Sequence, residues 1–148
     1  MKKVLASTFG AVLALSAVAA NAAPLDALKW DKRVLILFDQ SRSSASLDRQ
    51  IDRLRERRPD VDERDMIVLV SAGNERAAIA MGYARLPNGI ERTLRRFYKP
   101  AERGMTMILL GKDGSEKQRW NRTIDPQEIF DVIDSMPMRQ REMSEEET

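Results

Sequence analysis

The chain has 148 residues, with 25 basic and 23 acidic side chains and neither a cysteine nor a histidine. The absence of those two residue types excludes dithiol exchange, thiol peroxidation, histidine-assisted catalysis and metal sites built from cysteine or histidine. The length suits a single domain whose hydrophobic core must hold without disulfide bonds.

Residues 1–22 have the three-part layout of a secretory signal peptide. A basic start and a mainly apolar stretch lead to Ala20-Asn21-Ala22, which is a suitable cleavage triplet. The apolar stretch is short for a membrane anchor, and Pro24 would break its continuation. We expect cleavage after residue 22, with residue 20 as the alternative, and an exported protein, periplasmic or extracellular, without a membrane span.

Removal of this segment also changes the charge. Lys2 and Lys3 leave with it, so 23 basic and 23 acidic side chains remain. A mature domain that is about neutral gives no support for a nucleic-acid partner.

Three continuous apolar runs predict strands that are covered on both faces: residues 34–38, 66–70 and 105–110. A turn over 111–115 then leads to a short polar edge strand over 116–120. Residues 71–87 are rich in alanine and glycine and fit a loop with a short helix.

Three helices are expected between and after these strands. The first carries an apolar stripe and interleaved charges that predict ion pairs such as Asp52–Arg55, and it ends before Pro59. Asn88 is expected to cap the second. The third starts at the cap Asp125 and stops at Pro137. The residues 140–148 that follow form a polar, acidic tail and are expected to be disordered.

The resulting order, β-α-β-α-β-β-α, is the thioredoxin-like α/β arrangement over residues 23–139. It implies a central mixed sheet of about four strands and three helices. The first two strands would be parallel, and the last two would form a hairpin antiparallel to them. A doubly wound fold is the alternative, but it needs another parallel strand after the last helix.

The candidate ligand site lies where the first strand ends, because ligands of α/β sheets favour that edge. Its residues are Gln40, Ser41, Arg42, Ser43 and Ser44, together with Thr106 at the third strand. Hydroxyls, a guanidinium and a helix N-terminus could hold a small anion. The simpler interpretation is an ordinary polar loop, with Ser44 or Ser46 as the helix cap.

Catalysis has little support in these residues. A serine nucleophile needs a base, and Asp39 is a poor one at its ordinary pKa of about 3.9. Thr106 follows the place where a thioredoxin-like fold usually has a cis-proline, and Pro100 lies too early to serve. No catalytic residue, cofactor or metal site is therefore predicted.

Five segments carry a resemblance to a known family: 28–30, 33–38, 63–65, 110–114 and 133–139. Together they resemble the bacterial branch of the DUDES-type domain, a peroxiredoxin-like domain of unknown function that also occurs in sushi-repeat extracellular proteins and equarin. The resemblance covers about Leu25 to Met143. It implies a thioredoxin-like fold and an exported setting, and it brings no accepted catalytic residues.

Two functions follow as hypotheses. The first is a non-catalytic binding or adaptor domain for a protein or a small anionic ligand, with the oligomeric state left open. The second is a non-thiol enzyme or antioxidant related to peroxiredoxins. The segment from Met136 to Arg139 is interpreted as a helix end whose methionines pack into the core, with a docking or oxidation-sensitive methionine patch as the alternative.

Overall fold

The computed structural model describes residues 23–41, 43–73 and 77–148. The predicted signal peptide and Arg42 lie outside this described part. Five strands form one mixed sheet in the order β3-β2-β1-β4-β5. The strands are β1 (Arg33–Asp39), β2 (Met66–Ala72), β3 (Ala78–Met81), β4 (Thr106–Leu110) and β5 (Glu116–Trp120).

The central pairings agree with the sequence-based expectation. β1 runs parallel to β2 and antiparallel to β4, and β4 and β5 form the predicted hairpin. Every residue of β1 and β4 is buried, as the continuous apolar runs predicted. The thioredoxin-like α/β arrangement is therefore confirmed, with one strand more than expected.

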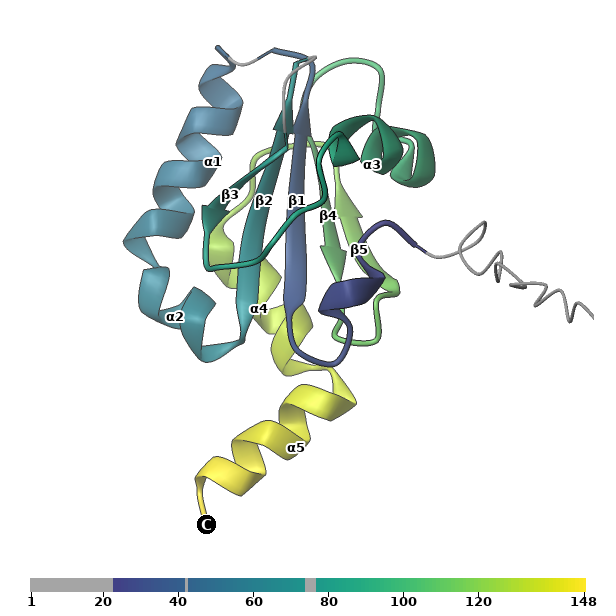
Figure 1. The fold of residues 1–148 in the computed structure, drawn as a ribbon. Coiled ribbons are helices and arrows are strands. Elements are labelled where there is room, and N and C mark those ends of the chain that lie inside the picture. Colours follow the sequence, from purple (N-terminus) through teal and green to yellow (C-terminus); the bar gives the residue numbers. More distant parts are fainter. Residues whose placement is uncertain (1–22, 42, 74–76) are drawn as a thin grey trace, which may run out of the picture.

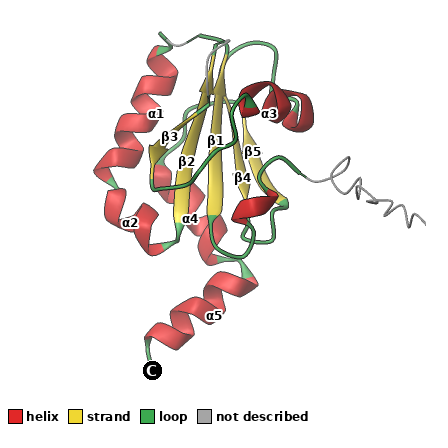
Figure 2. Cartoon of the chain, viewed as in Figure 1, coloured by secondary structure: helices red, strands yellow, loops and turns green. Residues whose placement is uncertain are grey.

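Helices cover both faces of the sheet (Figures 1 and 2). They are the short 3₁₀ helix η1 (Asp26–Leu28), α1 (Ala45–Glu56), α2 (Arg58–Glu63), α3 (Ile90–Tyr98), α4 (Pro126–Asp134) and α5 (Pro137–Glu146). Helices α1, α2 and α4 pack on the face that carries Leu35 and Leu37 of β1. Helix α3 and the segment around η1 pack on the opposite face, against Ile36 and Phe38.

Several boundaries differ from the prediction. Residues 71–87 contribute the edge strand β3, which pairs antiparallel with β2. The first helix ends before Pro59, as predicted, but Pro59 then lies in the first turn of a second helix, α2. The N-cap of α3 is Gly89, at φ 70°, and not the predicted Asn88. The predicted caps Ser44 and Asp125 are confirmed, since each accepts a hydrogen bond from a backbone N–H of its helix.

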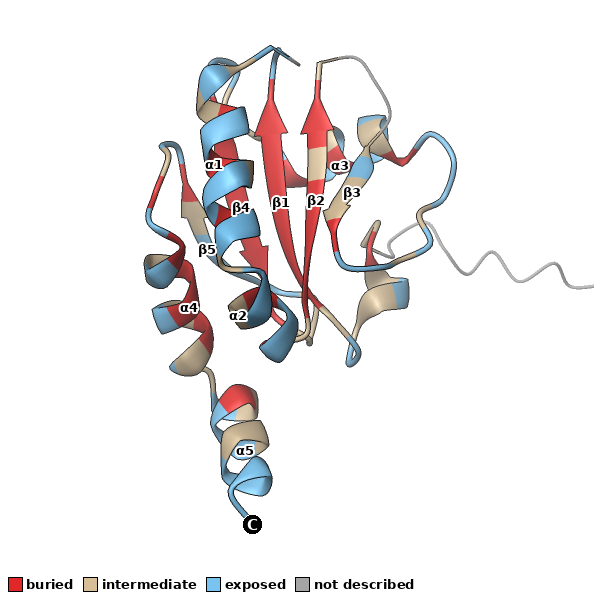
Figure 3. Ribbon diagram, turned by 90° about the vertical axis from the view of Figure 1, so that its left-hand side faces the viewer, coloured by how far each residue is buried: buried red, intermediate tan, exposed pale blue. Residues whose placement is uncertain are grey.

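The sequence predicted a disordered tail from residue 140, whereas in the structure this segment is helical as far as Glu146. Helix α4 ends at Asp134, before Pro137 as predicted, and Pro137 then starts α5, because proline has no N–H to lose in a helix's first turn. Helix α5 extends away from the body of the domain, and most of its residues beyond Arg139 are exposed (Figure 3).

Within the described residues, no helix is both long and apolar enough to cross a membrane.

Candidate functional site

The loop between β1 and α1, where the sequence predicted a ligand site, is closed largely by its own hydrogen bonds. The Asp39 carboxylate accepts from the Ser41 backbone N–H at 2.9 Å, and the Ser41 hydroxyl accepts from that of Ser43 at 3.2 Å. The Ser44 hydroxyl caps α1 through Leu47 at 3.3 Å. Gln40, Ser41 and Ser43 are exposed. The ligand-binding role of this loop stays a prediction.

Thr106 lies beside that loop, because it pairs with Phe38 at the end of β1. It is fully buried, and its hydroxyl accepts from the Ala101 N–H at 3.0 Å and donates to the Asn121 amide oxygen at 3.0 Å. The Thr106 hydroxyl is thus used within the fold. No cis peptide bond is present in the described part of the chain.

An arginine of α3 joins the ends of the two parallel strands. Nη2 of Arg95 donates to the backbone oxygens of Asp39 and Ser71, at 2.6 and 2.7 Å. Burial of the Arg95 guanidinium lowers its pKa, although the Asp39 charge opposes that shift. The guanidinium also lies 5.6 Å from the centre of the Phe38 ring. Sequence reasoning missed this clamp, which ties α3 to the sheet.

The opposite end of the sheet, where β1 and β2 begin, is built differently. Here the β4–β5 turn, the segment before β1 and the junction of α4 with α5 meet around a cleft of about 530 Å³. We call it the base cleft. Four of the five segments that carry the family resemblance, together with the start of the fifth (33–38), meet at this end, although they are far apart in the sequence.

The base cleft combines an apolar lining with a basic rim. Trp30, Val132, Met136, Pro137 and Met138 supply the apolar surface. Lys112, Lys117 and Arg141 supply positive charge, and Asp113 supplies one carboxylate, which pairs with Lys117. A volume within about 300–1,000 Å³ with a few polar groups is typical of small-molecule sites.

Trp30 is unusual in two respects. Its side chain is 68% exposed, and its φ of 68° places a bulky residue in the left-handed region. A hydrogen bond of 2.6 Å from the Trp30 N–H to the Lys112 oxygen fixes this backbone against the β4–β5 turn. The structure therefore holds an exposed indole at the cleft, and strained backbone of this kind is frequent at functional sites.

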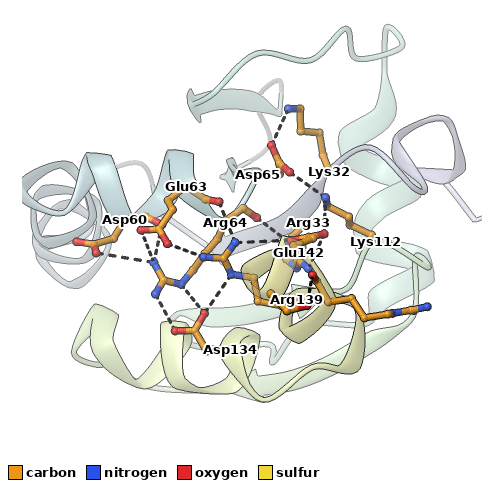
Figure 4. Close-up of polar contacts among 12 residues, drawn as sticks. Lys32, Arg33, Asp60, Glu63, Arg64, Asp65, Lys112, Asp134, Arg139 and Glu142 are labelled. Atoms are coloured by element: carbon orange, nitrogen blue, oxygen red, sulfur yellow. Dashed lines mark hydrogen bonds and ion pairs between the residues drawn. The ribbon is translucent and has the colours of Figure 1, made fainter. Parts of the chain in front are cut away.

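Beneath the cleft lies an ion network that we call the base network (Figure 4). Its cations are Lys32, Arg33, Arg64, Lys112 and Arg139, and its anions are Asp60, Glu63, Asp65, Asp134 and Glu142. The side chains of Arg33 and Arg139 are each only 1% exposed. Because uncompensated buried charges are costly, each guanidinium is held by several acceptors.

The contacts of the base network connect α5 to the rest of the domain. Glu142 of α5 accepts from both terminal nitrogens of Arg33, at 3.1 and 3.3 Å, and pairs with Lys112 at 2.7 Å. Arg139 bonds to Glu63 and to Asp134. Helix α5 is therefore fastened by charge pairs, and Arg139 is its one buried residue.

The carboxylates of the network have lowered pKa values. Burial alone would raise the pKa of Asp134, but hydrogen bonds and charge from Arg64 and Arg139 outweigh it. Burial would also raise the pKa of Glu142, but the hydrogen bonds and positive charges of Lys112 and Arg33 lower it. Both groups are thus held in the charged form, which suits a structural network better than proton transfer.

Sequence reasoning did not assign the base cleft as a site. It did consider a methionine patch from Met136 to Arg139. In the structure the methionines of this segment line the cleft, whereas Arg139 is buried beneath it. Met136 packs against the core, as expected, yet Met136 and Met138 both line the cleft and remain half-buried. Arg139 is buried in the network. The sequence signal that could have found the cleft was the set of five resemblance segments taken together.

The comparisons with known proteins agree with this fold. Thioredoxin peroxidase I of Plasmodium yoelii is similar in structure, with a TM-score of 0.54 and 15% identity over 79% of each chain. The mitochondrial 2-Cys peroxiredoxin of Plasmodium falciparum gives a TM-score of 0.52 and 12% identity, over 75% of this chain and 79% of that one. At such identities the likeness concerns the fold alone.

No curated protein matches the sequence. The narrower relationship to the bacterial DUDES-type branch and to the sushi-repeat proteins stays a prediction. Residues 24–142, which are most of the chain, match the family described as "Domain of unknown function (DUF4174)". The chain belongs to that family.

Proposed function

We propose that this protein is an exported, non-catalytic binding domain that uses the base cleft to hold its ligand. The observation that carries the proposal is the contrast in site geometry. The cleft offers a ligand-sized volume with an exposed indole and a basic rim, whereas the hydroxyls of Ser44 and Thr106 at the opposite edge are engaged within the fold.

The chemistry of the cleft also favours binding over catalysis. Its charged groups Lys112 and Lys117 are paired with carboxylates at 2.7–2.8 Å. Burial opposes the charged form of Lys112, but the hydrogen bonds that its ammonium donates to Asp65 and Glu142 raise its pKa, so the amine stays protonated and cannot act as a base. Ser135, the hydroxyl residue of the cleft lining, donates to the Val132 oxygen at 2.6 Å.

A non-thiol antioxidant is the alternative, and a peroxide assay separates it from a binding domain. The chain has eight methionines, and each can take one oxygen atom from hydrogen peroxide, which forms the sulfoxide and water. We expect consumption to stop at or below eight equivalents per chain, and insulin reduction to be absent. Sustained turnover beyond eight equivalents, in protein repurified to constant activity, would overturn the proposal.

Export is a separate part of the proposal, supported by the sequence of residues 1–22. Expression of the full chain in a bacterium with an outer membrane should yield a periplasmic protein whose N-terminus, read by mass spectrometry, is residue 23 or 21. Retention of the whole chain in the cytoplasm would contradict export and would leave the binding assignment to its own test.

A further inference from the structure

We propose that the base cleft binds an alkyl carboxylate, a monoanion with an unbranched apolar body such as a medium-chain fatty acid. This inference rests on the proposed function, since it names the ligand class for the same cleft. The apolar chain lies along Trp30, Met136 and Met138, and the carboxylate meets the Arg141 guanidinium at the rim.

The apolar lining suits a flexible chain. Two half-buried methionines from the α4–α5 junction face the same cleft as Trp30 and Val132. Methionine side chains are unbranched and polarisable, so they adapt to aliphatic ligands of variable shape. The exposed indole of Trp30 is 68% accessible in the absence of a ligand, and covering such a surface is favourable by about 25 cal/mol per Å² of apolar area.

The charge of the rim suits one negative group. The charged residues of the base network balance, five cations against five carboxylates. Lys117 pairs with Asp113 at 2.8 Å. Arg141 lines the cleft on exposed α5, and none of the ion pairs among the described residues includes it. One arginine with no carboxylate partner in the described part of the chain matches a monocarboxylate, which it can bind through two parallel hydrogen bonds.

A buried donor lies deeper at the same place. The Nε–H of Arg33, which borders the cleft, has no hydrogen-bond acceptor in the described structure, although its two terminal nitrogens are paired with Glu142. Leaving such a donor unpaired costs about 1–3 kcal/mol. A polar hydrogen without an acceptor at this end of the cleft favours an anion over a purely apolar ligand.

A peptide is a poorer occupant. Extended peptides are recognised through a series of unpaired backbone groups, usually along a strand edge. In the β4–β5 turn beside the cleft, the Gly111 N–H donates to the Ser115 oxygen and the Lys112 oxygen accepts from Trp30. These backbone groups are therefore already in use, and the lining instead offers side-chain apolar surface.

The experiment uses the mature chain and three probes: decanoate below its micelle concentration, decan-1-ol and acetate. Decanoate has both chain and charge, decanol lacks the charge, and acetate lacks the chain. Trp30 reports on the cleft, because the other tryptophan, Trp120, is only 6% exposed and lies outside it. We expect decanoate to shift the emission and to protect it from acrylamide quenching. Isothermal calorimetry records binding whether or not Trp30 responds.

Three variants locate the charge contact. Arg141→Gln should weaken decanoate binding about tenfold, the loss expected for one charge-assisted contact at an exposed rim. Arg141→Lys should recover part of the affinity. Arg49→Gln is the matched control, since Arg49 is an exposed helical arginine on α1, away from the cleft, and it should leave binding unchanged.

Each remaining outcome overturns the ligand assignment. Equal affinity for decanol would mean that the cleft does not select charge, and equal affinity for acetate would mean that it does not select the chain. The same conclusion follows if calorimetry detects no binding of decanoate, or if Arg141→Gln and Arg49→Gln behave alike. The non-catalytic assignment is tested separately, by peroxide turnover, and would survive any of these results, as would binding of another class of ligand in the cleft.

Discussion

The two ends of strand β1 differ in how their polar groups are satisfied. At its start, buried Arg33 joins a network of charged pairs that reaches α2, the β4–β5 turn and α5. At its end, buried Asp39 bonds to the backbone of its own loop, and its main-chain oxygen accepts from Arg95. One end gathers ion pairs between distant elements, whereas the other end combines hydrogen bonds within its own loop with the neutral backbone acceptors that hold Arg95.

This difference bears on where function should be sought. An α/β fold favours ligand sites at the carboxyl ends of parallel strands, but that rule describes the fold and not this chain's side chains. Here the exposed indole, the basic rim and the ligand-sized cleft are at the other end. Buried charge pairs are expensive to assemble, and they give little net stability compared with apolar packing. Their concentration under the cleft is consistent with a role in positioning α5.

The largest effect is expected from Asp134→Asn, which tests the ion network at the start of β1. Asp134 receives two hydrogen bonds from Arg64, at 2.9 and 2.7 Å, and one from Arg139 at 3.4 Å. Loss of its charge leaves two nearly buried guanidinium groups short of a partner. We expect a loss of about 3 kcal/mol in the free energy of unfolding, the lower end of the range for a broken buried pair, because Asp134 is itself 30% exposed.

Urea unfolding monitored by circular dichroism measures this loss. The matched control is Asp131→Asn on the same helix. Among the described residues its exposed carboxylate accepts one side-chain hydrogen bond, from Gln127, and the change should alter stability by less than about 0.5 kcal/mol. A loss from Asp134→Asn no larger than that of the control would mean that the base network does not hold the domain together.

The second test is the dependence of stability on pH. The pKa values of Asp134 and Glu142 are lower in the folded protein than their ordinary values of about 3.9 and 4.3. A lowered folded pKa adds stability that is complete above the unfolded value and is lost as the pH falls through the folded value. We therefore expect the free energy of unfolding to decrease steadily below about pH 4.5.

In Asp134→Asn the free energy of unfolding should fall less steeply with decreasing pH, because one of the contributing carboxylates is gone. Thermal denaturation at pH 6, 5, 4 and 3 compares the two proteins. Parallel curves for wild type and variant would show that Asp134 has the same pKa in the folded and unfolded states, which contradicts the contacts with Arg64.

The sequence predicted the centre of this fold better than its margins. Continuous runs such as 34–38 predicted strands covered on both faces, because only burial on two sides tolerates that pattern. Strand β3 was missed because it is only four residues long and two of them, Ala78 and Ala80, have low strand propensity, so its pairing depends on β2 alongside. Helix α5 was missed because it lacks an apolar stripe, and its fastening comes from partners as distant in sequence as Arg33.

The candidate site shows the same limit. The loop from Gln40 to Ser44 could be found from its position after a strand, and the cap Ser44 was foreseen. The base cleft required knowing that Trp30, Lys112 and Met138 meet in space. No local pattern encodes such a meeting, since it depends on the direction in which β4, β5 and α4 return to the start of β1.

The smallest expected effect concerns the other end of β1, through Thr106→Val. The change keeps the shape of the side chain and removes its hydroxyl, which leaves the Ala101 N–H without its acceptor and Asn121 without a donor. We expect a loss of about 1–2 kcal/mol, the cost of an unpaired, partly buried hydrogen-bonding group. Thr93→Val, on the exposed side of α3, is the control and should be nearly neutral.

The same variant also compares the two ends functionally. If Thr106 is a structural residue, decanoate binding at the base cleft should be unchanged in Thr106→Val, because the two places are at opposite ends of β1. Any small anion that binds the β1–α1 loop should likewise keep its affinity, since the hydroxyl points to Ala101 and Asn121. Loss of such an anion's binding without loss of stability would instead assign Thr106 to a ligand site at the end of β1. The end of β1, and not the base cleft, would then be the better candidate for the ligand site.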